Sequence, residues 1–458
     1  MNKRRIIAVS VMAMFAGAAH AGTNFDNFTP MTGDVGAGTL PENAPFKLSS
    51  PNFNQTSIAD RAAQLSAGQL NSGNWDMQTA NETGASAGRF LYTPFETATA
   101  GVQRLDLVTG VAKTIVQPGT QGFVAGDASR WTPWGSYLTA EEAWSSDSID
   151  PRNTKGRLFE ITNPLADPAA VNFVHRSIVP RVSHEGLAFD KNNNLYFIDE
   201  LNGGGIYKYV SANPSASTGN DYFAAGQTSV LKVGAGNNNR ATGAFIWTPI
   251  TDSNGSPLAG VNTSIEGSVD GRQAQDAIAS TSYNRPEDLE IQDLANGDQI
   301  LYAATTTDDE VYSINLSSNE VKLFASTNTF DAGTNAAAGA AFNSPDNLAI
   351  DAEGNIYIIE DQPGGVADIW FAKDADKDGV AESIGKWASL STEGAEPTGL
   401  YFDKFNPNVA YVNVQHPTSG IDRTIQISAP VPEPETWAMM AAGLGLVGFA
   451  ARRRKASR

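Results

Sequence analysis

Acidic side chains recur beside short apolar segments of the chain, in a pattern that could bind metal ions. The groups are Glu141-Glu142, Glu185, Glu287 after Arg285, Asp346-Asn347 with Glu360-Asp361, and Glu396. Calcium binds six to eight oxygen ligands from carboxylates, Asn carbonyls and water, so these residue types suit it if the fold brings them together. Bound metal ions can polarise a phosphoryl oxygen and supply the attacking oxygen. Arg285 could then hold the phosphate group of a phosphate ester through two parallel hydrogen bonds, which a lysine cannot match.

Other motifs narrow the chemistry. His184 and His416 accompany two of the acidic groups, and either could be structural, His416 above all. The run Asp374-Ala-Asp-Lys-Asp-Gly379 matches the start of an EF-hand-like calcium loop, but Gly385 stands where that loop needs a bidentate acid. We therefore expect a local calcium-stabilised or solvated turn there. GxSxG, P-loop and HExxH motifs are absent from the sequence, so serine hydrolases, P-loop enzymes and zincins have no support.

A repeat runs through the elements that must position these side chains. Residues 190–200 and 351–361 align without a gap as an Asp turn, an Asn, four strand residues and two carboxylates. Looser copies occupy residues 88–116, 134–161, 289–315 and 399–427. Short strands bounded by Gly, Asn and Asp, recurring at tens of residues, indicate a β-propeller. Because helical periodicity is nearly absent, the sequence predicts an all-β, six-bladed propeller.

The segments outside the repeat are polar. Residues 22–87 have little periodicity and are expected to form an N-terminal arm over the propeller, which itself spans residues 88–428. Residues 211–242 and 251–281 read as polar loop insertions. In a propeller the innermost strands line a central channel, so carboxylates at the same place in successive repeats should meet at the axis. A single such pair often only caps a turn, but several in register favour a shared site.

Charge and composition exclude other functions. The formal charge is −19, and removing a +3 leader and a +4 tail leaves a body near −26. Nucleic acid and anionic membranes are unsuitable partners for such a body, whereas divalent cations are suitable, although acidity can also serve solubility alone. The sequence contains no cysteine, which excludes disulfides and thiolate metal ligands.

Both ends of the chain carry sequence patterns typical of export and sorting signals. Residues 1–21 have a basic start, an apolar run and Ala19-His20-Ala21 at the end, as in a cleaved signal peptide. Near the other end, Val431-Pro-Glu-Pro434 precedes an apolar stretch at residues 437–451 and a basic cluster at 452–455. This order of parts, over residues 431–455, resembles the PEP-CTERM sorting signal of Gram-negative bacteria, which implies a sorting helix cut by an exosortase. A membrane anchor is the alternative at either end.

Two motifs resemble those of the PhoX-type alkaline phosphatases, which are secreted calcium- and iron-dependent β-propellers. The first is Thr132-Pro-Trp-Gly-Ser-Tyr-Leu-Thr-Ala-Glu-Glu142, and the second is Glu396-Pro-Thr-Gly399 with Gln415-His-Pro417. The resemblance covers most of residues 88–428 and implies Arg285 and Glu287 as catalytic residues. It also implies that metal is bound by Glu141, Glu142, Glu185, Glu287, Asp346, Asn347, Glu360, Asp361 and Glu396.

Ala140 is where the chain departs from this family. In the family a cysteine at this place bridges the iron pair, and alanine offers no ligand atom, so calcium is the expected cofactor and iron is not. The resemblance implies a metal-dependent phosphomonoesterase acting on phosphate monoesters, exported to the periplasm, outer surface or extracellular matrix. Its processing partners would be signal peptidase and exosortase, and an exopolysaccharide matrix would surround it. A non-catalytic calcium-binding propeller and a lactonase-like propeller are the alternatives.

Overall fold

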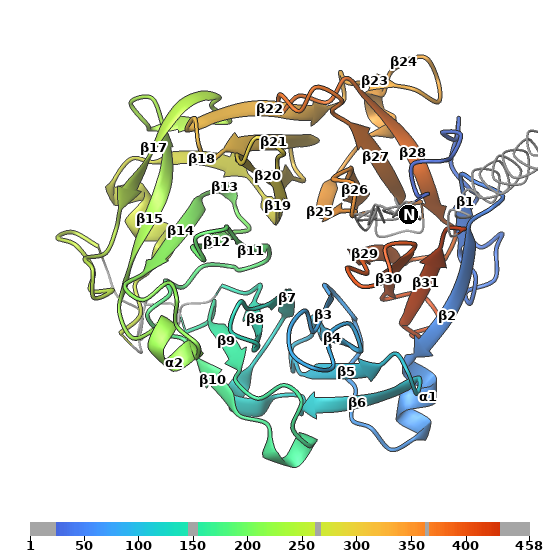
Figure 1. The fold of residues 1–458 in the computed structure, drawn as a ribbon, viewed down its shortest axis with the longest axis horizontal. Helices are drawn as coiled ribbons and strands as arrows, with labels where there is room; N and C mark the ends of the chain where they lie inside the picture. Colours follow the sequence, from blue (N-terminus) through green and yellow to red (C-terminus); the bar gives the residue numbers. More distant parts are fainter. Residues whose placement is uncertain (1–23, 145–153, 262–266, 362–365, 431–458) are drawn as a thin grey trace, which may run out of the picture.

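The computed structural model describes residues 24–144, 154–261, 267–361 and 366–430. The expected signal peptide and sorting signal lie outside the described residues. Antiparallel strands follow one another around a central axis, and the innermost strand of each group faces that axis (Figure 1). The fold is a mostly β propeller, as predicted. No helix within the described ranges is long and apolar enough to cross a membrane.

The strands of the propeller form antiparallel groups of four. With the innermost strand of each group first, the first two groups are β3 (Thr79–Ala80), β4 (Phe90–Pro94), β5 (Val102–Asp106) and β6 (Val111–Val116), and β7 (Gly126–Trp131), β8 (Tyr137–Glu141), β9 (Leu158–Ile161) and β10 (Phe173–His175). The next two are β11 (Leu187–Phe189), β12 (Leu195–Ile198), β14 (Ile206–Ser211) and β15 (Gly226–Val233), and β19 (Pro286–Asp293), β20 (Gln299–Thr305), β21 (Glu310–Asn315) and β22 (Glu320–Ser326). The last two are β25 (Pro345–Ile350), β26 (Ile356–Glu360), β27 (Asp368–Lys373) and β28 (Ser383–Leu390), and β29 (Glu396–Phe402), β30 (Val409–Gln415), β31 (Arg423–Ser428) and β2 (Asn54–Asp60).

Further helices and strands lie outside these groups of four. The helices are α1 (Arg61–Ser66), α2 (Gly219–Tyr222), α3 (Gly271–Ala277) and three short 3-10 turns at Thr120–Gly122, Pro168–Ala170 and Gly339–Ala341. The remaining strands are β1 (Phe46–Leu48), β13 (Asn202–Gly204), β16 (Asn238–Asn239), β17 (Gly243–Pro249), β18 (Thr281–Asn284), β23 (Phe330–Asp331) and β24 (Ala336–Ala337). β17 joins β15 to β22 in one nine-stranded sheet, so sheets and blades do not correspond one to one and the count of six blades stays a prediction.

The region expected to form an N-terminal arm contributes strands to the sheets. β2 pairs with β31, so a strand from the start of the chain completes the last group and closes the ring. β1 pairs with β28 and β3 pairs with β4. Closure removes exposed sheet edges at the junction, which are otherwise sites of unwanted pairing. The domain boundaries themselves stay a prediction.

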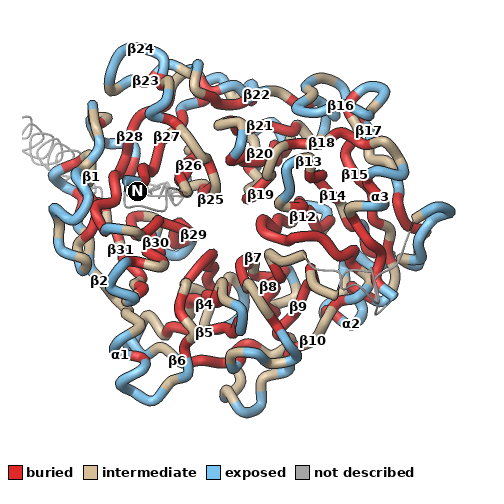
Figure 2. Tube along the Cα trace, turned by 180° about the vertical axis from the view of Figure 1, so that it is seen from behind, coloured by how far each residue is buried: buried red, intermediate tan, exposed pale blue. Residues whose placement is uncertain are grey.

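The core lies between neighbouring sheets, which are buried on both faces (Figure 2). In β26, Ile356 and Ile358 pack into one apolar cluster while Tyr357 and Ile359 pack into another on the opposite face. Successive side chains of a strand point to opposite faces, so a strand between two sheets must be apolar throughout. The unbroken apolar run Ile356–Ile359 therefore follows from its place in the ring.

Candidate metal centre

Irregular pairing of the innermost strands aims acidic side chains at the axis. The register shifts between Gly126 and Ser129 in β7, between Pro286 and Leu289 in β19, and between Pro345 and Leu348 in β25. A β-bulge inserts an extra residue and re-aims side chains. In each of these three strands the residue directly after the pair that precedes the shift is acidic and lines a pocket on the axis. These residues are Asp127, Glu287 and Asp346.

Two more carboxylates occupy the equivalent place. Glu185 lies two residues before Leu187, just as Glu287 lies two residues before Leu289, and both leucines begin the regular pairing. Asp76 follows Trp75, which pairs with Phe95. This pair is offset by one residue from the pairing of Thr79 with Tyr92, so the register also shifts between Trp75 and Thr79. We call Asp76, Asp127, Glu185, Glu287 and Asp346 the inner ring, and all five line the pocket.

A strained backbone precedes four members of the inner ring. The residues two positions earlier are Asn74, Ala125, Arg285 and Ser344, with φ of 48°, 39°, 50° and 45°. Positive φ is uncommon for residues other than glycine and concentrates at functional sites. The carbonyl groups of these four residues accept hydrogen bonds from the backbone N–H groups of Glu96, Glu142, Thr306 and Asp361. The same turn of the chain therefore also places Glu96, Glu142 and Asp361 beside the inner ring.

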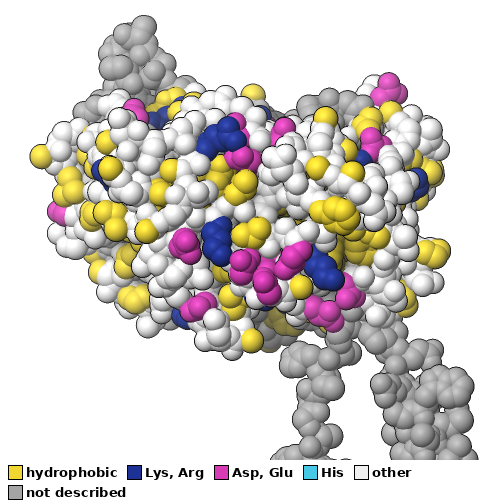
Figure 3. Space-filling view, turned by 90° about the horizontal axis from the view of Figure 1, so that it is seen from above, with side chains coloured by type: hydrophobic (Ala, Val, Ile, Leu, Met, Phe, Trp, Pro, Cys, Tyr) yellow, Lys and Arg dark blue, Asp and Glu magenta, His cyan; other side chains and the backbone are white. Residues whose placement is uncertain are grey.

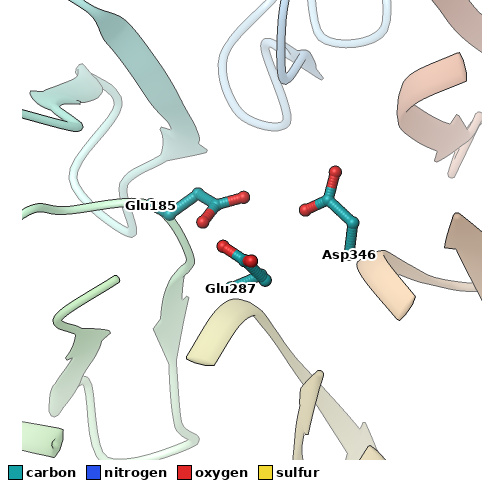
Figure 4. Close-up of side chains that lie close together, drawn as sticks. All are labelled: Glu185, Glu287 and Asp346. Atoms are coloured by element: carbon teal, nitrogen blue, oxygen red, sulfur yellow. The ribbon is translucent and has the colours of Figure 1, made fainter. Parts of the chain in front are cut away.

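The pocket on the axis is small, acidic and polar. It encloses about 220 Å³ and is lined by nine carboxylates with Arg285, Gln415 and His416. Oxygen atoms of Glu185, Glu287 and Asp346 lie within 4.8 Å of one another (Figure 4). Glu185 and Glu287 are buried, and Asp346 is half-buried. Carboxylates crowded in this way repel one another unless protons or cations neutralise them.

Burial and mutual repulsion raise the pKa values of most of these carboxyl groups. Burial raises the pKa of Asp76 to about 7, of Glu96 to about 8 and of Asp361 to about 9. The pKa values of Asp127, Glu142, Glu185 and Asp346 are raised well above the ordinary range by burial, and neighbouring carboxylates add to the effect. Metal ions that replaced protons on these groups would stabilise the folded protein.

Two cationic groups lie among the acids. The Arg285 Nε donates a hydrogen bond to Glu200 Oε1 at 2.7 Å, and its Nη2 lies 3.2 Å from Glu287 Oε1. The His416 Nε2 lies 2.9 Å from Glu396 Oε1, and this bond raises the pKa of His416 to about 9. Burial alone would raise the pKa of Glu396, but the bond from His416 lowers it. The Arg285 side chain lines the pocket and is 36% exposed.

The structure brings most of the predicted site residues together. Arg285, Glu142, Glu185, Glu287, Asp346, Asp361 and Glu396 line the pocket. Three do not. Glu141 is paired with Arg157, Glu360 accepts hydrogen bonds from Trp370 Nε1 and two backbone N–H groups, and Asn347 accepts from Thr398 Oγ1 and Gly399 N. Their oxygens are used within the fold, away from the pocket.

Ala140 packs in the core. It is fully buried and belongs to an apolar cluster with Leu138 and Leu158, and it does not line the pocket. The neighbouring residue Glu142 supplies the pocket contact of this segment. Replacing Ala140 by a residue with a ligand atom would therefore first place that atom in an apolar environment.

Sequence reasoning missed several pocket residues. Asp76, Glu96 and Asp127 were not among the predicted ligands, and His416 was expected to be structural although it lines the pocket beside Gln415. Glu96 could have been found, because it ends an apolar strand as Glu142 and Asp361 do. Asp76 and Asp127 lie in segments with no clear repeat, so their sequence carries little signal.

A second acidic group lies outside the pocket. Oxygen atoms of Asp374, Asp376 and Glu382 come within 4.8 Å of one another in the loop that resembles the start of an EF-hand. Asp374 accepts hydrogen bonds from the backbone N–H groups of Asp378 and Gly379, so the loop is already closed by its own chain. This loop joins β27 to β28 and takes no part in the pocket.

Two family models match the chain. The model described as alkaline phosphatase PhoX matches residues 119–418, and the model described as the PEP-CTERM protein-sorting motif matches residues 430–455. No curated protein matches it.

Solved structures resemble the chain at low identity. A protein of unknown function from Bacteroides thetaiotaomicron is 12% identical, covers 82% of this chain and 76% of its own, and has a TM-score of 0.43. A second protein from that organism, provisionally named a phosphatase, is 12% identical over 79% of this chain and 72% of its own, with a TM-score of 0.44. The aldose sugar dehydrogenase of Streptomyces coelicolor is 12% identical over 84% of this chain and 100% of its own, with a TM-score of 0.39.

Proposed function

Because the chain belongs to the alkaline phosphatase PhoX family, we propose that it is a metal-dependent phosphomonoesterase whose active centre is the acidic pocket on the axis. One observation carries the proposal: nine carboxylates and a single arginine surround a space of about 220 Å³. An anionic substrate can enter such a space only if metal ions outweigh the carboxylates. The arginine then offers a second contact that is specific for phosphate.

The residues of the pocket fit calcium. The donor atoms are almost all carboxylate oxygens, the ligands that calcium prefers. Asp127 Oδ1 and Glu185 Oε2 are buried without a hydrogen-bond partner in the described part of the chain, so both are available to a cation. A thiolate-bridged iron pair does not fit, because the sequence has no cysteine and Ala140 lies in the core. We therefore propose calcium bound by the inner ring together with Glu142, Asp361 and Glu396.

The chain's own side chains would orient the substrate. Bound calcium would polarise the phosphoryl oxygen and favour ionisation of the attacking water. Glu200 and Glu287 hold the Arg285 guanidinium from two sides, which fixes its plane and leaves its remaining N–H groups for phosphate oxygens. Fixed donors stabilise developing charge without reorganising during the reaction. All pocket-lining residues are charged or polar, so we propose that the site selects the phosphate group and accepts varied alcohols.

The sorting motif indicates export through the exosortase pathway of Gram-negative bacteria. We propose that signal peptidase removes residues 1–21 and that an exosortase removes the tail. The enzyme would then act in the periplasm, on the outer surface or in the exopolysaccharide matrix. Immunodetection of the body in separated periplasmic, membrane and matrix fractions, with and without the exosortase gene, tests this proposal. Retention of the full-length chain in cells that contain the exosortase would contradict it.

The activity is tested with p-nitrophenyl phosphate. The purified chain should hydrolyse it, a chelator should abolish hydrolysis, and added calcium should restore it. Calcium binding without hydrolysis would instead identify a non-catalytic calcium-binding propeller. Hydrolysis of lactones but not of phosphate esters would identify a lactonase-like propeller, which has no use for the arginine.

A further inference from the structure

The first and last described residues, Asn24 and Pro430, lie on the side of the propeller opposite the acidic pocket. β29 begins at the pocket residue Glu396, and β30 ends at the pocket residue Gln415, so the turn between them, residues 403–408, lies at the far end of both strands. Asn408 in this turn holds both ends of the described body. Its Oδ1 accepts from Asn24 N at 3.3 Å and its carbonyl from Ala429 N, while Asn24 Nδ2 donates to the carbonyl of Pro430 at 2.7 Å.

The tether that follows is short compared with the body. Only six residues separate Pro430 from Trp437, the first residue of the apolar stretch that precedes the basic cluster. Fully extended, they span about 25 Å. A compact body of roughly 400 residues has a radius of gyration of about 22 Å and thus a mean diameter of about 55 Å. The propeller is shortest along its axis (Figure 1), but a tether that reached the pocket face would have to pass outward to the rim and then along it. The tether is therefore too short for the body to turn its pocket face toward a membrane that holds the apolar stretch.

One exposed aromatic side chain lies beside the exit. Phe405 is 53% exposed at the tip of the turn, and Lys404 next to it has a side chain that is 58% exposed and forms an ion pair with Glu82 at 2.7 Å. Aromatic and basic residues of this kind anchor proteins at membrane interfaces. Both faces are acidic, because nine carboxylates line the pocket and Glu82, Glu290, Asp293, Asp351, Glu353 and Asp403 line the cavity beside the turn. The orientation therefore follows from the short tether and not from charge. On the rim seen in Figure 3 most basic side chains lie beside acidic ones and form no continuous cationic surface.

We propose that the face around residues 403–408 lies against the lipid headgroups while the sorting tail is inserted, so that the pocket opens away from the bilayer. Soluble substrates then reach the pocket before the tail is cut as well as after. This inference rests on the exit point and the sorting motif and does not depend on the phosphatase activity.

Fluorescence quenching from the membrane surface tests the orientation. Because the sequence has no cysteine, Asn406→Cys and Ser419→Cys each give a single labelling site without further changes. Both residues are exposed, one in the turn at the exit and the other in the turn between β30 and β31 on the pocket side. The chain that retains its tail is inserted into vesicles of phosphatidylethanolamine and phosphatidylglycerol that contain a spin-labelled headgroup. The label at position 406 should lose most of its fluorescence, and the label at position 419 should lose little.

A longer tether is the matched control. Inserting about 40 Gly and Ser residues after Pro430 adds a flexible span of about 35 Å, which should shrink the difference between the two labels. Equal quenching of the two labels at the native tether length, or stronger quenching at position 419, would overturn the proposal. A difference that survives the long tether would also overturn the tether argument, because it would show that another contact orients the body. Loss of phosphatase activity would leave the result unchanged.

Discussion

Glu141 and Glu142 are neighbours in the sequence, but their carboxylates face different surroundings. Glu142 lines the pocket, whereas Glu141 is fully buried and its carboxylate contacts Arg157 Nη2 at 2.6 Å and Nε at 3.0 Å. Consecutive strand residues point to opposite faces, so only one member of each acidic pair can reach the axis. Residue type alone could not decide which one.

Substitutions of this pair separate the two roles. Glu142→Gln should lower calcium affinity while leaving the melting temperature of the metal-free protein unchanged or higher, because it removes repulsion among the carboxylates. Glu141→Gln should destabilise the fold by about 3 kcal/mol, since it leaves the buried Arg157 without its charged partner. Calcium titration and thermal unfolding of both variants check the prediction. A weaker calcium affinity for Glu141→Gln than for Glu142→Gln would contradict it.

Arg285 makes a second prediction at this scale. Arg285→Lys keeps the positive charge but loses the planar fork that contacts Glu200 and Glu287 and that we propose to contact phosphate. Losing one charge-assisted hydrogen bond should raise the inhibition constant of inorganic phosphate about tenfold or more. Calcium content should stay at the wild-type level, which separates this variant from those that lose metal. An unchanged inhibition constant would show that Arg285 does not contact phosphate.

At the scale of elements, the inner ring depends on irregular pairing that repeats around the axis. In the last group the register shift falls between Thr398 and Tyr401, and the residues within it, Gly399 and Leu400, are not acidic. Gly399 has a φ of 59°, and a Cβ added there would lie 2.7 Å from the backbone N of Gln78. The ring is thus closed at this point by backbone packing of the N-terminal segment against β29.

Gly399→Ala should therefore destabilise the protein by about 2 kcal/mol or more, because the added methyl group meets backbone atoms. Gly110→Ala is the matched control. Gly110 also has a positive φ, of 69°, but a Cβ there would meet nothing within 4 Å, so the expected loss is only about 1 kcal/mol. Denaturant unfolding of both variants measures the difference. Equal losses would mean that β29 can move away from the N-terminal segment at little cost.

The sequence was informative where elements are regular and uninformative where they are not. The Asp turns at 190–194 and 351–355, each followed by an apolar strand, predicted both the propeller and the ends of its strands. The bulges at Asp127 and Asp346 arise from pairing between distant segments, which a single sequence does not display. For the same reason Asn347 and Glu360 were assigned to the metal although their oxygens bond within the fold.

For the whole molecule, the balance of charge in the pocket links stability to pH. The pKa values of Asp76, Glu96 and Asp361 rise from about 4 in the unfolded chain to about 7, 8 and 9 in the metal-free fold. Above pH 5 the folded state therefore binds more protons than the unfolded state, and the stability of the metal-free protein should fall as pH rises toward 9. In the proposed metal centre calcium takes the place of these protons, so its stabilising effect should grow over the same range.

Melting temperatures measured at pH 5.5, 7 and 8.5, with chelator and with calcium, check this dependence. The difference between the two series should widen with pH. A metal-free protein whose stability rises between pH 5.5 and 8.5 would contradict the pocket electrostatics described above.

The most direct test of the central claim is the calcium content of the purified chain and two variants, measured by mass spectrometry after gel filtration. Glu287 and Asp293 lie on the same strand, β19, but Glu287 belongs to the inner ring while Asp293 is exposed at the other end. We predict that the wild-type chain and Asp293→Asn retain the same amount of calcium and that Glu287→Gln loses at least one ion. A wild-type chain without calcium, or full retention by Glu287→Gln, would contradict the proposal that the inner ring is a metal centre.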